Sequence, residues 1–299
     1  MNNVVAILGP TASGKSKIAL KLAKDLNGEI ISCDSIQIYK HLDIASAKPS
    51  KHDQVNVKHH LIDILSPNDE FSSSQFSQLA RQAIDDVLSR GKLPILCGGT
   101  GLFVKGLVEN YDFAQCPKNE KLRSSYYDIL NKHGAEKLYE MLKELNPEKA
   151  RTLNVNDTTR IIRALEISHH GCMPGSNTNQ AHQSKVLNFK LVALDVDRQE
   201  LYQKINSRVD QMVQAGLFEE VESLVKRFNL SSSSPCMKGI GYKEALLYLN
   251  GEIDQNSCVE LIKQKTRNYA KRQLTWFRHM NDINWFNPNN YSDILNFCK

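Results

Sequence analysis

Near the N-terminus, the segment from Gly9 to Ser16 reads GPTASGKS, which has the spacing of a phosphate-binding loop. It follows an apolar run at residues 3–8 and precedes a segment with helical periodicity, the strand–loop–helix context that this motif needs. In such a loop the backbone N–H groups converge on phosphate oxygens, and the helix N-terminus adds favourable dipole charge. We therefore predict that a diphosphate is held by Gly9, Pro10, Thr11, Ala12, Ser13, Gly14, Lys15 and Ser16.

Two side chains of this loop have predicted chemical roles. Lys15 can place its ammonium on a terminal phosphate, and Ser16 can offer its hydroxyl to Mg²⁺, which makes Mg²⁺ the predicted cofactor. The motif does not specify whose phosphates the loop holds. A small-molecule kinase that uses ATP is therefore one open alternative.

The remaining pattern does not match a nucleotide hydrolase. Such enzymes place a Mg²⁺-handling aspartate at the end of another core strand. Here the run LPILCGG ends in glycines and Thr100, with no carboxylate. The guanine-selecting N-K-x-D pattern is also missing, because NKHG at 131–134 lacks the aspartate. The sequence thus argues against a GTPase.

Asp34 stands at the end of the second apolar run, EIISC. Ligands of parallel α/β sheets bind at the carboxyl ends of the strands, so this carboxylate is a candidate site residue. It could act as a general base, bind Mg²⁺, or cap the turn that follows. His59 and His60 do not form a convincing zinc site, because adjacent residues of a strand point to opposite faces.

A basic stripe is present near the C-terminus, in KQKTRNYAKRQLTWFR from Lys263 to Arg278, which contains no acidic residue. Lys263, Arg267 and Lys271 recur every four residues, so they share one face of a helix. Phosphate contact is a natural role for such a stripe. The interleaved aromatic residues are assigned to the hydrophobic core, and they are Tyr269, Trp276 and Phe277.

The surrounding elements must place these residues together. Apolar runs at 3–8, 29–34, 60–66 and 93–98 alternate with helical patterns at 15–27 and 72–91, the latter beginning in a serine cluster and ending at Gly91. Gly28 is predicted to stop the first helix as a C-cap glycine. This alternation predicts an α/β fold, a P-loop NTPase-like parallel sheet flanked by helices.

A helical insertion interrupts this fold. Strand patterns vanish from Cys116 to about Gln183, and the run FKLVALDVD at 189–197 then predicts a further strand of the same sheet. Helices are expected at about 198–228 and 257–280. The predicted domains are a catalytic core from 1–115 and 184–299, with basic C-terminal helices, and an inserted all-helical domain from 116–183.

Composition limits the class of protein. The 299 residues carry a net charge of +5, a mild excess that says little by itself. No apolar run approaches the ~20 residues of a membrane helix. The seven cysteines contain no C-x-x-C pair, and the first strand begins almost at once, leaving no room for a targeting peptide. We expect a reduced, cytoplasmic monomer without structural zinc.

Seven blocks give the chain a resemblance to a known family. In order they are GPTASGKS, DSIQIYKHLDIASAKP, HHLIDI, GGTGLF, RIIRALE, KGIGYKE and AKRQLTWFR. Together they resemble the tRNA dimethylallyltransferases, or bacterial-type tRNA isopentenyltransferases, over nearly the whole chain. The resemblance implies transfer of a dimethylallyl group from its diphosphate to N6 of adenosine 37, within a run of adenosines 36 to 38. It also implies that the helical insertion grips the anticodon stem-loop of tRNA.

The resemblance further implies roles for single residues. Catalysis is assigned to Lys15, Asp34, Thr100 and Arg208, with Asp34 as the base that takes the N–H proton and Arg208 near the diphosphate. Asp34, Ser35, Ile36, Gln37 and Thr100 are expected to contact the adenosine. The other predicted tRNA contacts are Arg123, Thr159, Arg160, Ile161, Ile162, Arg163, Lys238, Lys263, Arg267, Lys271, Arg272 and Arg278.

The departures from the family pattern are small. Phe103 replaces the usual tyrosine, and Ser46 replaces the usual threonine but keeps a hydroxyl. Besides the kinase, two alternatives stay open. One is an isopentenyltransferase that acts on free adenine nucleotides. The other is a non-catalytic RNA-binding NTPase module, in which Asp34 would be dispensable.

Overall fold

The computed structural model describes residues 2–110, 116, 119–170 and 187–299, and it divides the chain into two compact units. One unit consists of Met1–Asn110 and Lys185–Lys299, and the other of Tyr111–Ser184. The sequence places these junctions at 115/116 and 183/184. Each unit has its own hydrophobic core.

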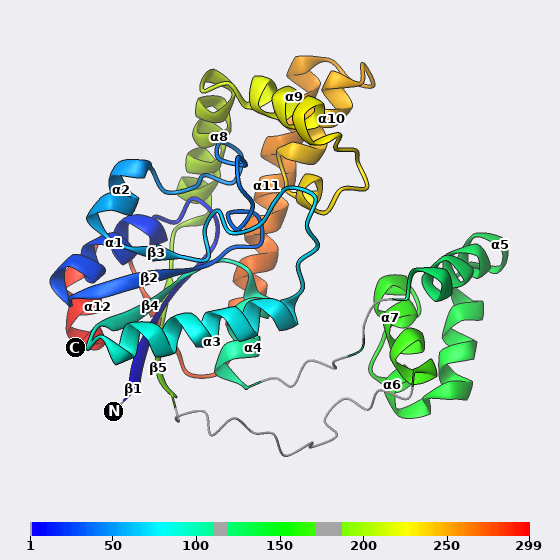
Figure 1. The fold of residues 1–299 in the computed structure, drawn as a ribbon, viewed down its shortest axis with the longest axis horizontal. Coiled ribbons are helices and arrows are strands. Elements are labelled where there is room, and N and C mark those ends of the chain that lie inside the picture. Colours follow the sequence, from blue (N-terminus) through cyan, green and yellow to red (C-terminus); the bar gives the residue numbers. More distant parts are fainter. Residues whose placement is uncertain (1, 111–115, 117–118, 171–186) are drawn as a thin grey trace. The chain divides into compact units, whose positions relative to one another are not determined.

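The larger unit contains a six-stranded sheet with the order β3-β2-β4-β1-β5-β6 (Figure 1). All neighbouring strands are parallel, which confirms the predicted parallel α/β fold. The strands are β1 Asn2–Leu8, β2 Gly28–Cys33, β3 His59–His60, β4 Leu93–Gly98, β5 Leu187–Leu194 and β6 Ile283–Phe286. The carboxyl ends of β1, β2 and β4 therefore lie side by side at one edge.

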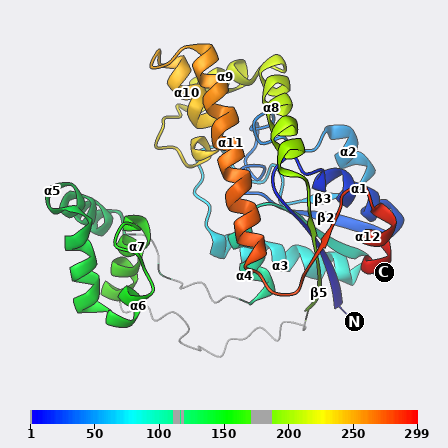
Figure 2. The ribbon, with the colours of Figure 1, turned by 180° about the vertical axis from the view of Figure 1, so that it is seen from behind.

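Helices cover both faces of this sheet. The helices of the larger unit are α1 Lys15–Asp25, α2 Lys51–Asn56, α3 Ser73–Ser89, α4 Gly101–Val108, α8 Arg198–Gln214, α9 Leu217–Phe228, α10 Tyr242–Leu249, α11 Gln255–Arg278 and α12 Tyr291–Cys298, with a short 3₁₀ helix at Pro235–Lys238. α1 and α12 pack on one face, and α3 and α4 on the other. Figure 2 shows α8 and α11 lying next to each other. None of the described helices is long and apolar enough to cross a membrane.

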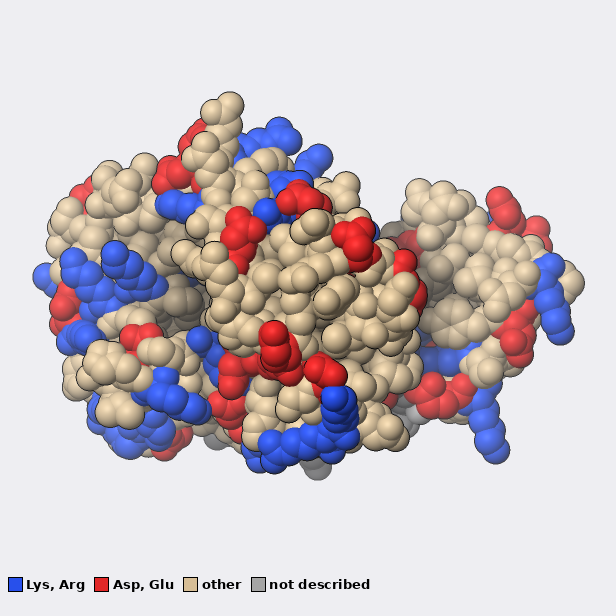
Figure 3. Space-filling model, turned by 90° about the horizontal axis from the view of Figure 1, so that it is seen from above, with Lys and Arg blue, Asp and Glu red and all other residues tan. Residues whose placement is uncertain are grey.

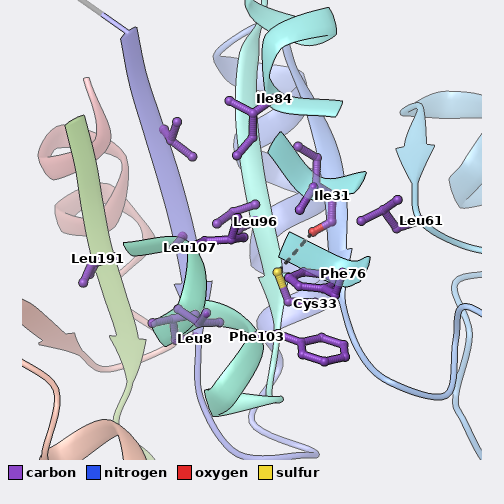
Figure 4. Close-up of a cluster of buried hydrophobic side chains, with 14 of the residues drawn as sticks. Leu8, Ile31, Cys33, Leu61, Phe76, Ile84, Leu96, Phe103, Leu107 and Leu191 are labelled. Atoms are coloured by element: carbon purple, nitrogen blue, oxygen red, sulfur yellow. Dashed lines mark hydrogen bonds between the residues drawn. The ribbon is translucent and has the colours of Figure 1, made fainter. Parts of the chain in front are cut away.

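The hydrophobic core beneath α3 and α4 is formed by apolar side chains of the strands and of these two helices (Figure 4). Leu8, Ile31 and Leu96 come from the strands and are fully buried. The rings of Phe76 and Phe103 stack with their centroids 4.0 Å apart. Phe103 is only 6% exposed, so a tyrosine at this position would place a hydroxyl group in the core, which phenylalanine avoids.

Local sequence signals explain several boundaries and fail at others. The side chain of Ser72 caps α3 in a reciprocal pair with Gln75, as the serine cluster predicts. The predicted C-cap role of Gly28 is wrong, because this residue begins β2. A Cβ atom at Gly28 would lie 2.9 Å from the Leu93 carbonyl oxygen, so the glycine permits close strand pairing.

Other helices and strands differ from the prediction. The helix expected at 198–228 is two helices, α8 and α9, because Gly216 adopts a positive φ of 93° between them. The strand expected at 60–66 is only the two-residue β3. The edge strand β6 and the terminal helix α12 were not predicted.

The described part of the smaller unit contains helices and no strand, as predicted. It consists of α5 Glu120–Leu145, α6 Pro147–Arg151 and α7 Thr158–His169, with a break in α5 at Gly134. Its core is formed mainly by Tyr126, Leu138, Leu142 and Leu165.

A buried carboxylate joins the two long helices of the smaller unit. Glu166 on α7 is completely buried, and it accepts hydrogen bonds from the Arg123 and Arg163 guanidinium groups and from the Asn119 backbone N–H. Burial alone would raise the pKa of Glu166, but these donors hold it at about 2. The carboxylate is therefore charged and fully paired at neutral pH.

We expect Glu166→Ala to destabilise the smaller unit by about 2 kcal/mol or more, because two cations and a backbone N–H lose their partner. Thermal unfolding followed by circular dichroism would show this loss. Glu140→Ala is a matched control on α5, since this carboxylate is exposed and, among the residues that the structure describes, pairs only with Lys137. Equal melting temperatures for the two variants would contradict the assignment.

Candidate active site

A pocket opens at the carboxyl ends of the central strands, where the sequence predicts the site. Six predicted site residues line it, namely Thr11, Lys15, Ser16, Asp34, Gln37 and Arg208. The pocket also includes residues to which the sequence assigned no definite site role, namely Ile30, Ser32, Ser46, Ala47, Pro49, His59, Ile62, Cys97, Gly98, Gly99, Tyr269 and Gln273. Segments from both ends of the chain thus share one cavity.

The phosphate-binding loop connects β1 to α1. Gly9 and Gly14 have φ values of 148° and 90°, which side-chain-bearing residues rarely adopt, and Gly14 is the N-cap of α1. The N-terminus of α1 therefore faces the pocket with its unpaired N–H groups. This geometry suits an anion.

The Lys15 ammonium lies inside this loop and donates a hydrogen bond to the Pro10 carbonyl oxygen at 3.0 Å. Burial, and to a smaller extent the Arg208 cation, lower the pKa of Lys15 to about 8, while Cys97 and Asp34 act in the opposite sense. Without a bound anion, a substantial fraction of Lys15 is therefore neutral near pH 8. An anion bound beside it would restore the charge.

Binding of inorganic pyrophosphate should consequently take up a proton near pH 8. Lys15 is charged below its pKa and neutral above it, so we expect affinity to fall by up to about tenfold per pH unit between pH 8 and 10. Calorimetry in two buffers of different ionisation enthalpy measures this uptake. In Lys15→Met we expect fewer protons to be taken up per pyrophosphate bound than in the parent protein. An equal number of protons in the two proteins would contradict the role of Lys15.

Arg208 enters the same region from α8. Its Nη1 atom lies 3.5 Å from the Thr11 hydroxyl oxygen. Burial lowers its pKa, and Asp34 opposes that shift. The structure thus places this arginine at the phosphate loop, where a cation can meet an anionic ligand.

Asp34 directly follows β2, and its carboxylate uses one oxygen to shape the next turn. Oδ1 accepts hydrogen bonds from the backbone N–H groups of Ile36 at 2.8 Å and Gln37 at 3.3 Å. Within the described residues, Oδ2 has no hydrogen-bond partner. Oδ1 therefore fills the capping role considered for Asp34, and the base role would fall to Oδ2.

The loop after β2, residues 34–50, is tightly tied to the rest of the unit. The Lys48 side chain is 3% exposed, and its ammonium donates to the Tyr39 carbonyl oxygen at 2.9 Å and to both Asp43 and Asp63 at 2.6 Å. On the other side, Glu220 of α9 accepts hydrogen bonds from the backbone N–H groups of Asp43 and Ile44. These contacts fix the loop that carries Asp34.

The KGIGYKE block packs on the same loop. A Cβ atom at Gly239 would lie 3.1 Å from the Ile36 side chain, and one at Gly241 would lie 2.8 Å from Ala45. The two glycines therefore allow close approach. Tyr242 adds a hydrogen bond to Glu220 at 2.8 Å, so this block supports the loop after β2.

Gln37 fixes the inner side of this loop. Its amide nitrogen donates to the Ser46 and Ala47 carbonyl oxygens, and its amide oxygen accepts a hydrogen bond from Ser32 at 3.0 Å. The hydroxyl of Ser46 donates to the Leu42 carbonyl oxygen at 2.6 Å. Ser35 and Ile36 belong to the same turn but do not line the pocket.

Thr100 follows β4 and is the N-cap of α4. Its backbone N–H donates to the Cys33 carbonyl oxygen at 3.3 Å, which ties the turn to the strand that precedes Asp34. Its hydroxyl is buried near the Tyr269 hydroxyl of α11, and Thr100 does not itself line the pocket.

The aromatic residues of α11 divide between core and site. Phe277 is fully buried and Trp276 packs against the same core, as predicted. The assignment of Tyr269 to the core is corrected, because this ring lines the pocket. Burial, with a smaller contribution from Asp34, raises the pKa of Tyr269 to about 12.

The adjacent histidines have separate partners, as their alternation in a strand predicts. His59 lines the pocket, and its Nδ1–H donates to the Val57 carbonyl oxygen at 2.7 Å. His60 Nε2 lies 2.7 Å from the carboxylate of Glu29, which is also bound by Arg90. His60 thus belongs to an ion-pair network outside the pocket.

The basic stripe of α11 is only partly available. Lys263 is paired with Asp210 at 2.9 Å and Glu260 at 3.0 Å, and Arg267 donates to Asn206 at 2.7 Å. Lys263, for which the spacing predicted a phosphate contact, is therefore already paired with two carboxylates. The exposed basic residues among those predicted to contact RNA in this unit are Lys238, Lys271, Arg272 and Arg278. Figure 3 shows acidic side chains interspersed among the basic ones on one face.

In the smaller unit the predicted RNA contacts have different surroundings. Ile161 and Ile162 are 0% and 3% exposed, so their side chains pack in the core and are not available to RNA. Arg123 and Arg163 are held by Glu166. The exposed members of the set are Thr159 and Arg160.

The pocket fits Mg²⁺, which prefers oxygen ligands and commonly binds through one or two protein groups, substrate phosphates and water. Ser16 offers a hydroxyl and Asp34 a carboxylate to the same cavity. Among the described residues there is no group of three or more His, Cys, Asp or Glu side chains that could hold a metal. Most ligands of a Mg²⁺ ion here would therefore be substrate oxygens and water.

A family model described as IPP transferase matches residues 37–280. The chain is 43% identical to a tRNA dimethylallyltransferase of Acetivibrio thermocellus, in an alignment that covers 100% of this chain and 96% of the relative. It is 44% identical to a tRNA dimethylallyltransferase of an Exiguobacterium species, covering 98% of this chain and 93% of the relative.

Solved structures give the same result. The crystal structure of a tRNA isopentenylpyrophosphate transferase from Bacillus halodurans is similar with a TM-score of 0.74 and 37% identity, covering 99% of this chain and 95% of the other. A eukaryotic dimethylallyltransferase acting on tRNA is similar with a TM-score of 0.77 and 28% identity, covering 97% of this chain and 75% of the other.

Proposed function

The chain belongs to the IPP transferase family, and from this we propose that it transfers a dimethylallyl group from dimethylallyl diphosphate to N6 of adenosine 37 of tRNA. One structural observation supports the reaction. A single pocket joins the phosphate loop, with Lys15 and Arg208, to the carboxylate of Asp34. A leaving diphosphate and an acceptor amine can therefore be bound beside each other.

The proposed step is a displacement at the allylic carbon. The bond between that carbon and the diphosphate oxygen breaks, and a bond from N6 to the same carbon forms. Lys15, Arg208 and the N-terminus of α1 offset the charge that develops on the leaving diphosphate. Mg²⁺ bound with the help of Ser16 would supply further charge neutralisation.

The proton of the acceptor amine also needs a destination. The lone pair of an exocyclic adenine nitrogen is delocalised into the ring, so a base that accepts the N–H proton assists attack. Oδ2 of Asp34 is the oxygen left available by the capping contacts of Oδ1. The products are N6-(dimethylallyl)adenosine, diphosphate and a protonated carboxyl group that returns its proton to solvent.

A transfer assay separates this function from its alternatives. The protein is incubated with labelled dimethylallyl diphosphate, Mg²⁺ and either AMP or an anticodon stem-loop with adenosines at positions 36 to 38. We expect label in the RNA alone. Label in AMP would support an enzyme acting on free nucleotides, and no transfer to either acceptor would leave the kinase and the non-catalytic RNA-binding module as the alternatives.

A monomeric state and a cytoplasmic location remain parts of this proposal. Light scattering during size-exclusion chromatography tests the first, with one chain of 33.9 kDa expected. Cell fractionation tests the second.

A further inference from the structure

Gln273 on α11 is a buried side chain without a role in the reaction as described so far. It is 5% exposed, and both ends of its amide are used. Its Oε1 accepts a hydrogen bond from the Thr11 backbone N–H at 2.8 Å, and its Nε2 donates to the Gly99 carbonyl oxygen at 2.9 Å. One side chain therefore joins the phosphate loop to the turn that carries Thr100.

Each of the two hydrogen bonds of the Gln273 amide reaches a defined backbone group of the site. Thr11 belongs to the loop after β1, and its hydroxyl also lies 3.5 Å from Arg208. A Cβ atom at Gly99 would lie 2.0 Å from Nε2 of Gln273, so only a glycine lets the amide reach the turn. A buried amide with both ends satisfied holds its partners more firmly than an exposed one.

The neighbouring residues of α11 reinforce this contact. Tyr269, one helical turn earlier, lines the pocket. Trp276 packs closely on the start of α4, directly after Thr100. A Cβ atom at Gly101 would lie 2.2 Å from the Trp276 ring. The phosphate loop at Thr11 and the turn at Gly99 and Thr100 are therefore connected through Gln273.

We propose that Gln273 is a positioning residue that couples the two substrate sites, so that a diphosphate on the loop strengthens binding of the acceptor RNA. The inference rests on the proposed function, in which the loop holds the diphosphate and the Thr100 turn faces the acceptor adenosine. Such coupling is reciprocal, so RNA strengthens binding of the diphosphate by the same factor.

Two variants separate the contacts of the amide. Gln273→Met has a similar length but removes both hydrogen bonds, whereas Gln273→Glu keeps an acceptor for the Thr11 N–H and loses the donor to Gly99. Gln264→Met is a matched control, because Gln264 is exposed on the same helix. Circular dichroism and thermal unfolding first establish that each variant is folded.

The measurement is the affinity for a fluorescent anticodon stem-loop by anisotropy, with and without saturating inorganic pyrophosphate and Mg²⁺. In the parent protein and the control, we expect pyrophosphate to tighten RNA binding by about tenfold. In both Gln273 variants we expect this factor to fall to about one to two, while RNA affinity without pyrophosphate changes little.

Three outcomes would overturn the proposal. The first is that pyrophosphate tightens RNA binding by Gln273→Met as much as by the parent protein. The second is that pyrophosphate leaves the RNA affinity of the parent protein unchanged. The third is that neither variant folds, which would assign Gln273 a purely structural role. Failure of the proposed function is seen separately, as absence of label transfer by the parent enzyme.

Discussion

Asp34→Asn is expected to bind the anticodon stem-loop as the parent enzyme does and to lose turnover by a factor of about 10²–10⁴. The amide oxygen of asparagine can still accept hydrogen bonds from the Ile36 and Gln37 N–H groups, so the turn after β2 is kept. The amide cannot take the proton from N6. Single-turnover transfer to RNA and anisotropy with the same RNA measure the two effects.

Asp34→Ala provides the comparison that separates the two oxygens. It removes the capping acceptor as well as the base, so RNA affinity and thermal stability should fall together with turnover. If Asp34→Asn keeps turnover within a few-fold of the parent, Asp34 is not the base. If Asp34→Asn loses RNA binding as Asp34→Ala does, the effect lies in the turn and not in proton transfer.

The parts of the fold that the sequence predicted are those set by local pattern. The apolar runs that became β1, β2 and β4 and the capped helix α3 carry their information in consecutive residues. β6 has only four residues, INWF, which is too short a run for an alternating pattern to be recognised. β3 pairs with β2 through only two residues, which is too short for any periodicity.

The contacts that complete the candidate site could not be predicted in this way. Gln273 lies 262 residues from its partner Thr11, and Glu220 lies 176 residues from Ile44. In the sequence, each is one polar residue among others on a helix, a pattern typical of a solvated face. The carboxylate partner of Lys263 was missed for the same reason, because the regular spacing on α11 predicted a phosphate contact and Asp210 lies on another helix.

The position of Lys15 leads to the second large effect. Lys15→Met should lower kcat/KM for dimethylallyl diphosphate by about 10²–10³, as for other lost charge-stabilising contacts to a developing anion. The same change should raise the melting temperature of the protein measured without added diphosphate. Burial disfavours the Lys15 ammonium, as its lowered pKa of about 8 shows, and methionine removes the charge while keeping the length of the side chain.

Opposite changes in activity and stability would distinguish a functional charge from a structural one, since active sites commonly lose stability by holding charges ready for a ligand. Lys17→Met is the matched control, because Lys17 is exposed on the same helix and should change neither property. Steady-state transfer and calorimetric melting at pH 7 measure both. A Lys15→Met variant that melts lower and keeps its kcat/KM would show that the ammonium supports the loop through Pro10 and not the leaving diphosphate.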